Sequence, residues 1–136
     1  MLLLSNKVWA CSNGHSYDVA KEGYVNLLLV QNKNSKQPGD NKKMVNGRRA
    51  FLEQGFYQPL ADSISKIFNQ HLASVTEHGE VNFFDAGCGE GYYMSQVSQL
   101  CNQDKVKIEF SGLDISKFAV QKAAKKYPEN HFAVAS

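Results

Sequence analysis

Residues 81–135 alternate between strand-like and helix-like patterns, and this alternation limits the range of folds more than any other feature of the sequence. The patterns predict, in order, a strand at 81–86, a helix at 91–101, a strand at 107–113, a helix at 116–127 and a strand at 131–135. Strands joined by single helices of this length form right-handed crossovers in a parallel sheet. We therefore expect an α/β fold, with a parallel sheet that is covered by helices on both faces.

The first 30 residues indicate a small β unit instead. Residues 7–11 form a strand-like stretch, Asn13-Gly14 is typical of a tight turn, and residues 23–29 form a second extended stretch. Each stretch is short, so this unit would be an appendage to the larger sheet.

A linker and two helices are predicted between the β unit and the sheet. Residues 31–45 are expected to form a flexible linker or loop, because their first part lacks apolar side chains and contains Pro38-Gly39. Helical patterning begins near Lys42, Gly55 is a plausible stop, and Pro59 suits the first turn of the next helix. One apolar stripe of that second helix consists of Leu60, Ile64, Ile67, Phe68 and Leu72.

The composition fits one domain with a small appendage. The chain has 136 residues, of which 43% are hydrophobic, and no apolar run approaches the roughly 20 residues that cross a bilayer. Three cysteines at irregular spacing do not make a disulfide framework, so we expect a cytoplasmic protein without membrane contact. Residues 1–50 hold eight Lys/Arg against three Asp/Glu, a basic excess that would suit a polyanion or reflect surface lysines beside a loop.

A glycine-rich turn follows the first strand of the alternating region. In the stretch D-A-G-C-G-E-G, Gly87, Gly89 and Gly91 can adopt positive φ and expose N–H groups near a helix N-terminus. The spacing fits neither a dinucleotide fingerprint nor a P-loop. Asp85 and Glu90 would repel a pyrophosphate but accept the cationic amino end of an amino-acid-like cofactor.

An acidic residue closes the next strand, in the stretch G-L-D-I-S. Asp114 in this place can accept both ribose hydroxyls of an adenosine, and Ser116 would cap the following helix. Taken alone, Asp114 would more often be a capping or loop residue. Its combination with the glycine turn favours a nucleoside-binding role.

These two stretches resemble motifs I and II of the class I S-adenosylmethionine-dependent methyltransferases. Four stretches resemble, more narrowly, the bacterial 23S rRNA guanine-N1 methyltransferases: A-K-E-G-Y-V-N-L-L, P-G-D, R-R-A-F-L-E-Q-G-F-Y-Q-P-L and D-A-G-C-G-E-G-Y-Y. The resemblance implies methyl transfer from S-adenosylmethionine to N1 of a guanine in a 23S rRNA hairpin. It also implies that residues 46–136 are the N-terminal half of a Rossmann-like methyltransferase domain, and that residues 1–30 are part of a zinc-ribbon-like RNA-recognition unit.

The resemblance also implies roles for single residues. Gly89 and Glu90 would contact the cofactor, and Gly87 and Gly91 would shape the turn. Tyr57 matches a tyrosine that reaches the cofactor in this family, although its position before a helix also suits a hydrophobic staple. Asp85 would contact the cofactor or hold the turn, and no base for the guanine proton can be named.

Cys11 and His15 stand where the similar enzymes carry half of a zinc ribbon. The expected upstream C-x-x-C pair is absent, so we expect no tightly bound metal in this chain, although these two residues are the zinc ligands we would name for an intact protein. Cys88 and Cys101 are explained by turn packing and a buried helix face.

The sequence stops at the third strand of the predicted sheet, whereas the similar enzymes continue, so we expect a fragment of a larger enzyme. An open edge strand would invite association, including a homodimer. Trp9 would be a core residue or, beside the basic N-terminal residues, an RNA contact. A small-molecule methyltransferase and a non-catalytic RNA-binding remnant are the alternative functions.

Overall fold

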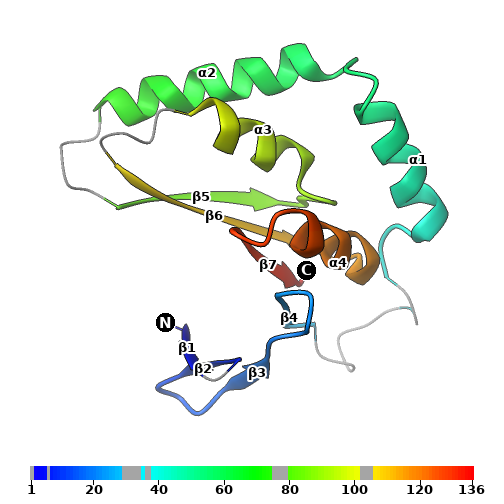
Figure 1. Cartoon of the computed structure of the whole chain (residues 1–136). Coiled ribbons are helices and arrows are strands. Elements are labelled where there is room, and N and C mark those ends of the chain that lie inside the picture. Colours follow the sequence, from blue (N-terminus) through cyan, green and yellow to red (C-terminus); the bar gives the residue numbers. More distant parts are fainter. Residues whose placement is uncertain (1, 6, 29–34, 36–37, 75–79, 102–105) are drawn as a thin grey trace.

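The computed structural model describes residues 2–5, 7–28, 35, 38–74, 80–101 and 106–136. It contains a small antiparallel sheet and a four-stranded parallel sheet with helices (Figure 1). The small sheet has the order β1-β2-β3, and its strands are β1 (Leu2–Ser5), β2 (Val8–Cys11) and β3 (Ser16–Asp18). No helix in the described ranges has the length and apolar character that would span a membrane.

The predicted alternation of strands and helices is confirmed. The elements are β5 (Glu80–Ala86), α3 (Tyr92–Leu100), β6 (Lys107–Asp114), α4 (Lys117–Lys126) and β7 (His131–Val134). All strand pairs of this sheet are parallel, and their order is β4-β7-β6-β5. The strands β5, β6 and β7 therefore follow one another across the sheet in chain order.

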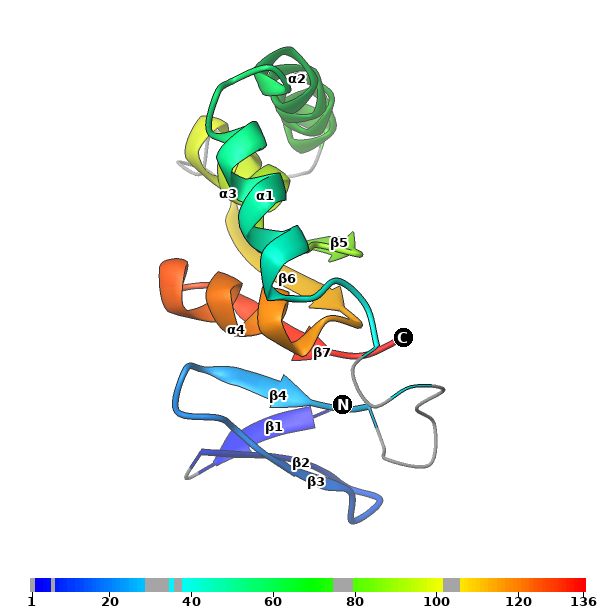
Figure 2. The same cartoon turned by 90° about the vertical axis from the view of Figure 1, so that its right-hand side faces the viewer.

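The helices cover one face of the sheet, so the prediction of helices on both faces is wrong for the described residues. Two right-handed crossovers that step across the sheet in one direction place their helices on the same side, and Figure 2 shows α3 and α4 there. Helix α2 (Gln58–Ser74) joins them, since Phe68 contacts Phe83 and Phe110. The residue after Phe83 points the other way, and Phe84 is 60% exposed.

Helix α1 (Lys42–Leu52) begins inside the region that was predicted to be a linker. The Asn41 side chain caps it by accepting hydrogen bonds from the backbone N–H groups of Lys43 and Met44. Residues 42–45 are therefore helical. Of the predicted linker before them, only residues 35 and 38–41 lie among the described residues.

Helix α2 begins next to Pro59, as predicted, but the predicted apolar stripe is only partly correct. Leu72 is buried, whereas Leu60 and Ile67 are 46% and 67% exposed. Small residues, Ala61 and Ser65, are buried in their place, and they allow α2 to approach α3 closely. The predicted stripe was defined by large apolar side chains, so it could not indicate that small residues are buried at the contact with α3.

Strand β4 (Tyr24–Asn26) belongs to the larger sheet and not to the small β unit in which we expected residues 23–29. Tyr24 pairs with Phe132 of β7, and both side chains are buried in the main core. β4 therefore covers the outer edge of β7. The small sheet is attached nearby, where the Trp9 ring lies 5.9 Å from the ring of His131 in an edge-to-face arrangement.

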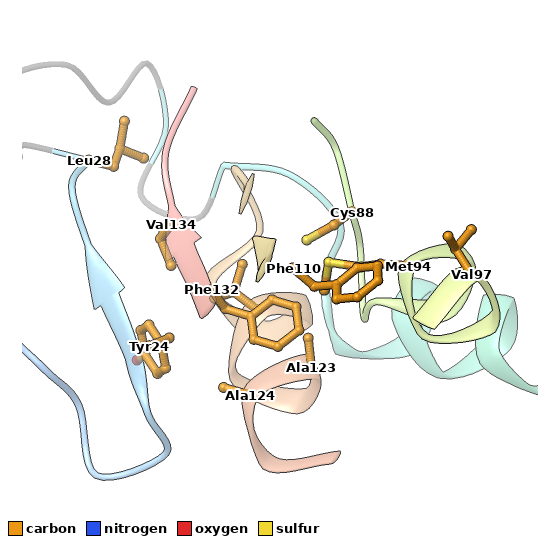
Figure 3. Close-up of a cluster of buried hydrophobic side chains, with 11 residues drawn as sticks. Tyr24, Leu28, Cys88, Met94, Val97, Phe110, Ala123, Ala124, Phe132 and Val134 are labelled. Carbon is orange, nitrogen blue, oxygen red and sulfur yellow. The ribbon is translucent and has the colours of Figure 1, made fainter. Parts of the chain in front are cut away.

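The core lies between the parallel sheet and the helices α3 and α4 (Figure 3). Met94 and Val97 of α3 and Val120 of α4 are fully buried. Small side chains on α4 let the helix pack closely on the sheet, among them Ala123 and Ala124. This core fixes the carboxyl ends of β5 and β6, where the glycine turn and the acidic residue meet.

Candidate cofactor site

The glycine turn after β5 has the backbone conformation that the sequence predicted. Gly87, Gly89 and Gly91 have φ angles of +83°, +55° and +79°. Their N–H groups, which we expected to be available to a ligand, form hydrogen bonds within the protein instead. They donate to the carbonyl of Leu113, to the Asp114 carboxylate and to the carbonyl of Cys88, respectively.

The space around the turn explains why three of its residues are glycines. A Cβ atom added to Gly87 or Gly89 would have no heavy atom within 4 Å, so both residues face open space. A Cβ atom added to Gly91 would lie 3.3 Å from the Tyr127 ring and 3.4 Å from the Phe132 ring. Gly91 therefore allows α3 to pack on the core, while Gly87 and Gly89 leave a bare surface for a ligand.

Asp114 is directed toward this turn. Its Oδ2 accepts the N–H of Gly89 at 3.0 Å, and its Oδ1 accepts the N–H of Ser116 at 2.7 Å. Each carboxylate oxygen can accept a second hydrogen bond, so hydroxyl groups of a ligand can still bind. Ser116 caps α4 as predicted, because its Oγ accepts the N–H of Ala119.

A cleft of about 340 Å³ lies above the turn. It brings together four of the predicted cofactor residues: Tyr57, Gly87, Gly89 and Glu90. The other lining residues are Arg48, Phe51, Leu52, Cys88, Tyr92 and Tyr93. Of the other predicted residues, Asp114 bonds the turn from the next strand, and Asp85 and Gly91 flank the turn in sequence.

Glu90 is the buried charged group of this cleft. Its side chain is 7% exposed, its Oε1 accepts from Arg49 Nε at 2.6 Å, and its buried Oε2 has no hydrogen-bond partner among the described residues. The hydrogen bond to Glu90 raises the pKa of Arg49. No role was predicted for Arg49, although it lies in one of the stretches that carry the resemblance. An ionised carboxylate with one unpartnered oxygen can accept an ammonium group of a ligand.

Aromatic side chains form part of the wall of the cleft. Phe51 contacts the Tyr57 ring at 5.7 Å, and the rings of Tyr92 and Tyr93 lie 5.1 Å apart. Burial raises the pKa of Tyr93, with smaller contributions from Tyr57 and Tyr92. Phe51, Tyr92 and Tyr93 were not predicted as site residues, although all three lie in stretches that carry the resemblance.

A second cleft, of about 360 Å³, lies beside the β6–α4 connection that follows Asp114. Its apolar lining includes Leu28, Ile115 and Val134. The P-G-D stretch closes this side: a Cβ atom on Gly39 would lie 2.8 Å from Ile115 Cγ2, and the Ser116 hydroxyl donates to the Asp40 carbonyl at 2.6 Å. Only glycine permits this close approach at φ +79°.

Cys88 is predicted to resist alkylation in the folded protein. Its Sγ lies 2.8 Å from the position of a Cβ added to Gly112, and burial, aided by the charges of Asp85 and Asp114, raises its pKa to about 12. The thiolate is the reactive species, so Cys88 stays unmodified at pH 8 while Cys11, which is half-exposed, reacts. Peptide mass spectrometry after iodoacetamide treatment measures both, and faster labelling of Cys88 than of Cys11 contradicts this assignment.

Asp85 is predicted to lower the stability of the empty fold at neutral pH. Burial, and then the charge of Asp114, raise the pKa of Asp85 above its ordinary 3.8. Between the ordinary value of 3.8 and the raised pKa, the folded state therefore binds more protons than the unfolded state, and stability is lost as the pH rises through this window. Asp85→Asn should melt at a higher temperature than the wild type at pH 7, with a difference that shrinks toward pH 4. A variant that melts lower at pH 7 contradicts this.

Cys11 and His15 lie together at the tip of the β2–β3 hairpin, with 3.3 Å between Cys11 Sγ and His15 Nδ1. A structural zinc ion needs four ligands. The described residues contain no group of three or more His, Cys, Asp or Glu side chains that could hold a metal. The pair therefore fits half of a zinc site.

Comparisons with known proteins agree with this geometry. A zinc-ribbon family model described as "RlmA, N-terminal" matches residues 1–36, and one described as "Methyltransferase domain" matches residues 77–136. The 23S rRNA (guanine(748)-N(1))-methyltransferase of Streptomyces fradiae is 33% identical over 131 residues, and the alignment covers 96% of this chain.

Two provisionally named 23S rRNA (guanine-N(1)-)-methyltransferases, YxjB of Bacillus subtilis (strain 168) and a protein of Micromonospora griseorubida, are both 32% identical to this chain. The chain spans 43–44% of the length of these three relatives. It contains the methyltransferase region with the glycine turn and Asp114, preceded by the zinc-ribbon region. The chain is therefore similar over nearly its whole length to these 23S rRNA guanine-N1 methyltransferases, and its two ends match the zinc-ribbon and methyltransferase family models.

Proposed function

We propose that this chain supplies the S-adenosylmethionine-binding part of an enzyme that methylates N1 of a guanine in a 23S rRNA hairpin. One observation carries the proposal: Asp114 of β6 bonds the N–H of Gly89, and the buried Glu90 presents an unpartnered oxygen beside the same bare turn. A nucleoside and a cationic amino acid joined in one molecule would satisfy both carboxylates. The names of the relatives support the choice of rRNA as substrate.

The cleft residues would divide the cofactor between them. Glu90 would accept the ammonium group of the methionine part, and Asp114 would accept the ribose hydroxyls. The sulfonium is a cation, so the tyrosine rings of the wall, including Tyr57, would attract it. The apolar cleft beside Ile115 would receive the adenine ring. Asp85, Gly87, Gly89 and Gly91 would keep the turn in shape.

The cofactor would supply its methyl group to guanine N1 by direct displacement: the bond from the methyl carbon to N1 would form as the bond to the sulfonium sulfur breaks, a neutral thioether would be left, and the N1 proton would leave. Catalysis would come mainly from holding the two reactants in line, with the base turned out of its stack. No side chain of this chain is assigned as the acceptor of the N1 proton. Zinc would belong to the hairpin of Cys11 and His15 and to RNA recognition, not to the chemical step.

Titration calorimetry of the chain with S-adenosylmethionine tests the proposal. We expect saturable binding with a dissociation constant within roughly 1 μM to 1 mM, and no binding of NAD, because the turn lacks a pyrophosphate-binding spacing. Absence of heat and of a thermal shift with S-adenosylmethionine contradicts the proposal and favours a non-catalytic remnant. RNA affinity that does not change with salt favours a small-molecule methyltransferase.

We place the enzyme in the cytoplasm, where ribosomal RNA is made and where free thiols such as Cys11 and Cys88 persist. We also propose that the protein forms a homodimer, because Phe84 on the edge strand β5 is 60% exposed. Sedimentation velocity at micromolar concentration tests the homodimer, and a monomer under these conditions contradicts it.

A further inference from the structure

The helices α1 and α4 pack against each other and carry eight of the 15 Lys and Arg residues of the chain. A groove of about 450 Å³ lies along them. Its basic lining residues are Lys42, Arg49, Lys122, Lys125 and Lys126. This surface was not predicted as a unit, because three of its five basic residues belong to α4, outside the basic first 50 residues.

Carboxylates compensate this charge only in part. Arg49 is paired with Glu90, the Lys125 ammonium lies 3.8 Å from Glu22, and the Lys126 ammonium lies 3.6 Å from Glu53. The last two pairs involve lysine side chains that are 58% and 43% exposed, so they are weak and can exchange for another anion.

Two cations of the groove have no ion pair with a described carboxylate. Lys42 is one of them. Lys122 is the other: it donates to the Asn46 side chain at 2.5 Å, and its ammonium lies 5.3 Å from the centre of the Phe118 ring. The groove therefore keeps an excess of positive charge within a concave surface, where the field of several cations adds up.

We propose that the groove between α1 and α4 binds backbone phosphates of RNA. The choice of RNA as the polyanion rests on the proposed function. Regularly spaced phosphates match a row of lysines on two adjacent helices better than a single small anion does, and such contacts position an RNA without reading its sequence. Arg49 belongs to this groove and also bonds Glu90 of the cofactor cleft, so RNA in the groove would lie next to the methyl donor.

Fluorescence anisotropy with a labelled 23S rRNA hairpin tests the groove. The hairpin carries guanine 748, the base in the name of the Streptomyces fradiae relative. For Lys122→Gln/Lys125→Gln we expect affinity to fall on the order of tenfold at 0.1 M salt, and the slope of log affinity against log salt to fall by about two. The matched control is Lys66→Gln, an exposed lysine on α2 away from the groove, which should stay within about twofold of the wild type.

The thermal midpoint and calorimetry with S-adenosylmethionine show whether each variant is folded, since neither lysine lines the cofactor cleft. The inference is wrong if the double variant binds the hairpin like the wild type, if Lys66→Gln loses as much, or if the wild type does not bind the hairpin. If RNA binding depends on the groove lysines but S-adenosylmethionine does not bind, the proposed methyltransferase function is wrong and the RNA-binding role of the groove is supported. If S-adenosylmethionine binds but RNA binding does not depend on the groove lysines, only the RNA-binding role of the groove is wrong.

Discussion

Replacing Asp114 with asparagine is expected to raise the dissociation constant for S-adenosylmethionine by roughly 100-fold. The carboxylate accepts the N–H of Gly89 and the N–H of Ser116, one with each oxygen. Asparagine keeps the size but offers one acceptor oxygen, so a backbone N–H would face an NH₂ group and the ribose would lose a charged acceptor. Hydrogen bonds to charged groups contribute about 1.5–3 kcal/mol each, and about 2.7 kcal/mol corresponds to 100-fold.

Asp62→Asn is the matched control for this prediction, because Asp62 is exposed on α2 and does not line the cofactor cleft. It should bind the cofactor like the wild type in the same calorimetric titration. Far-ultraviolet circular dichroism of both variants separates lost binding from lost structure. A folded Asp114→Asn protein with wild-type affinity contradicts the role of Asp114.

Replacing Arg49 with alanine is expected to destabilise the fold by about 2–3 kcal/mol. The substitution leaves the Glu90 carboxylate, which is 7% exposed, without its ion-pair partner. Removing one member of a fully buried pair costs about 3–5 kcal/mol, and the smaller figure here reflects the 26% exposure of Arg49. Urea unfolding at pH 7 measures the change in the free energy of unfolding.

The neighbouring Arg48 provides the control. It pairs with Asp40 at 2.7 Å, but its side chain is 56% exposed, so Arg48→Ala should cost no more than about 1 kcal/mol. Adding Glu90→Gln to Arg49→Ala should recover part of the lost stability, because the double variant no longer buries an unpaired charge. Equal costs for Arg48→Ala and Arg49→Ala would mean that Glu90 is not held as a buried carboxylate.

The parallel sheet and the order of its helices could be predicted because both follow from local periodicity. The strand at 81–86 alternates in burial, and the helix at 116–127 has a capping serine and a small, buried face. The partner of β4 could not be predicted in this way. A three-residue strand carries too little pattern to show which sheet it joins, and its pairing with β7 spans more than 100 residues of sequence.

The parts of the candidate site that depend on backbone shape, the glycine turn and the acidic strand end, could be predicted from the sequence. Gly87, Gly89 and Asp114 follow strand ends in a recognisable order, and the structure brings them together. Arg49 could not be found, because its role depends on α1 lying against the glycine turn, 41 residues further along the chain. The N–H groups of Gly87 and Gly89 bond Leu113 and Asp114 of the neighbouring strand, and a local sequence pattern could not show these hydrogen bonds.

The most direct measurement is a titration of ¹⁵N-labelled chain with S-adenosylmethionine, followed through the backbone amide signals. If the bare turn and the adjacent strand end hold the cofactor, the amides of Gly87, Gly89, Glu90 and Asp114 will shift saturably, with one common dissociation constant, and those of the distant hairpin around Cys11 will not. Signals at the turn that stay unchanged at saturating cofactor, or shifts confined to other regions, would contradict the account.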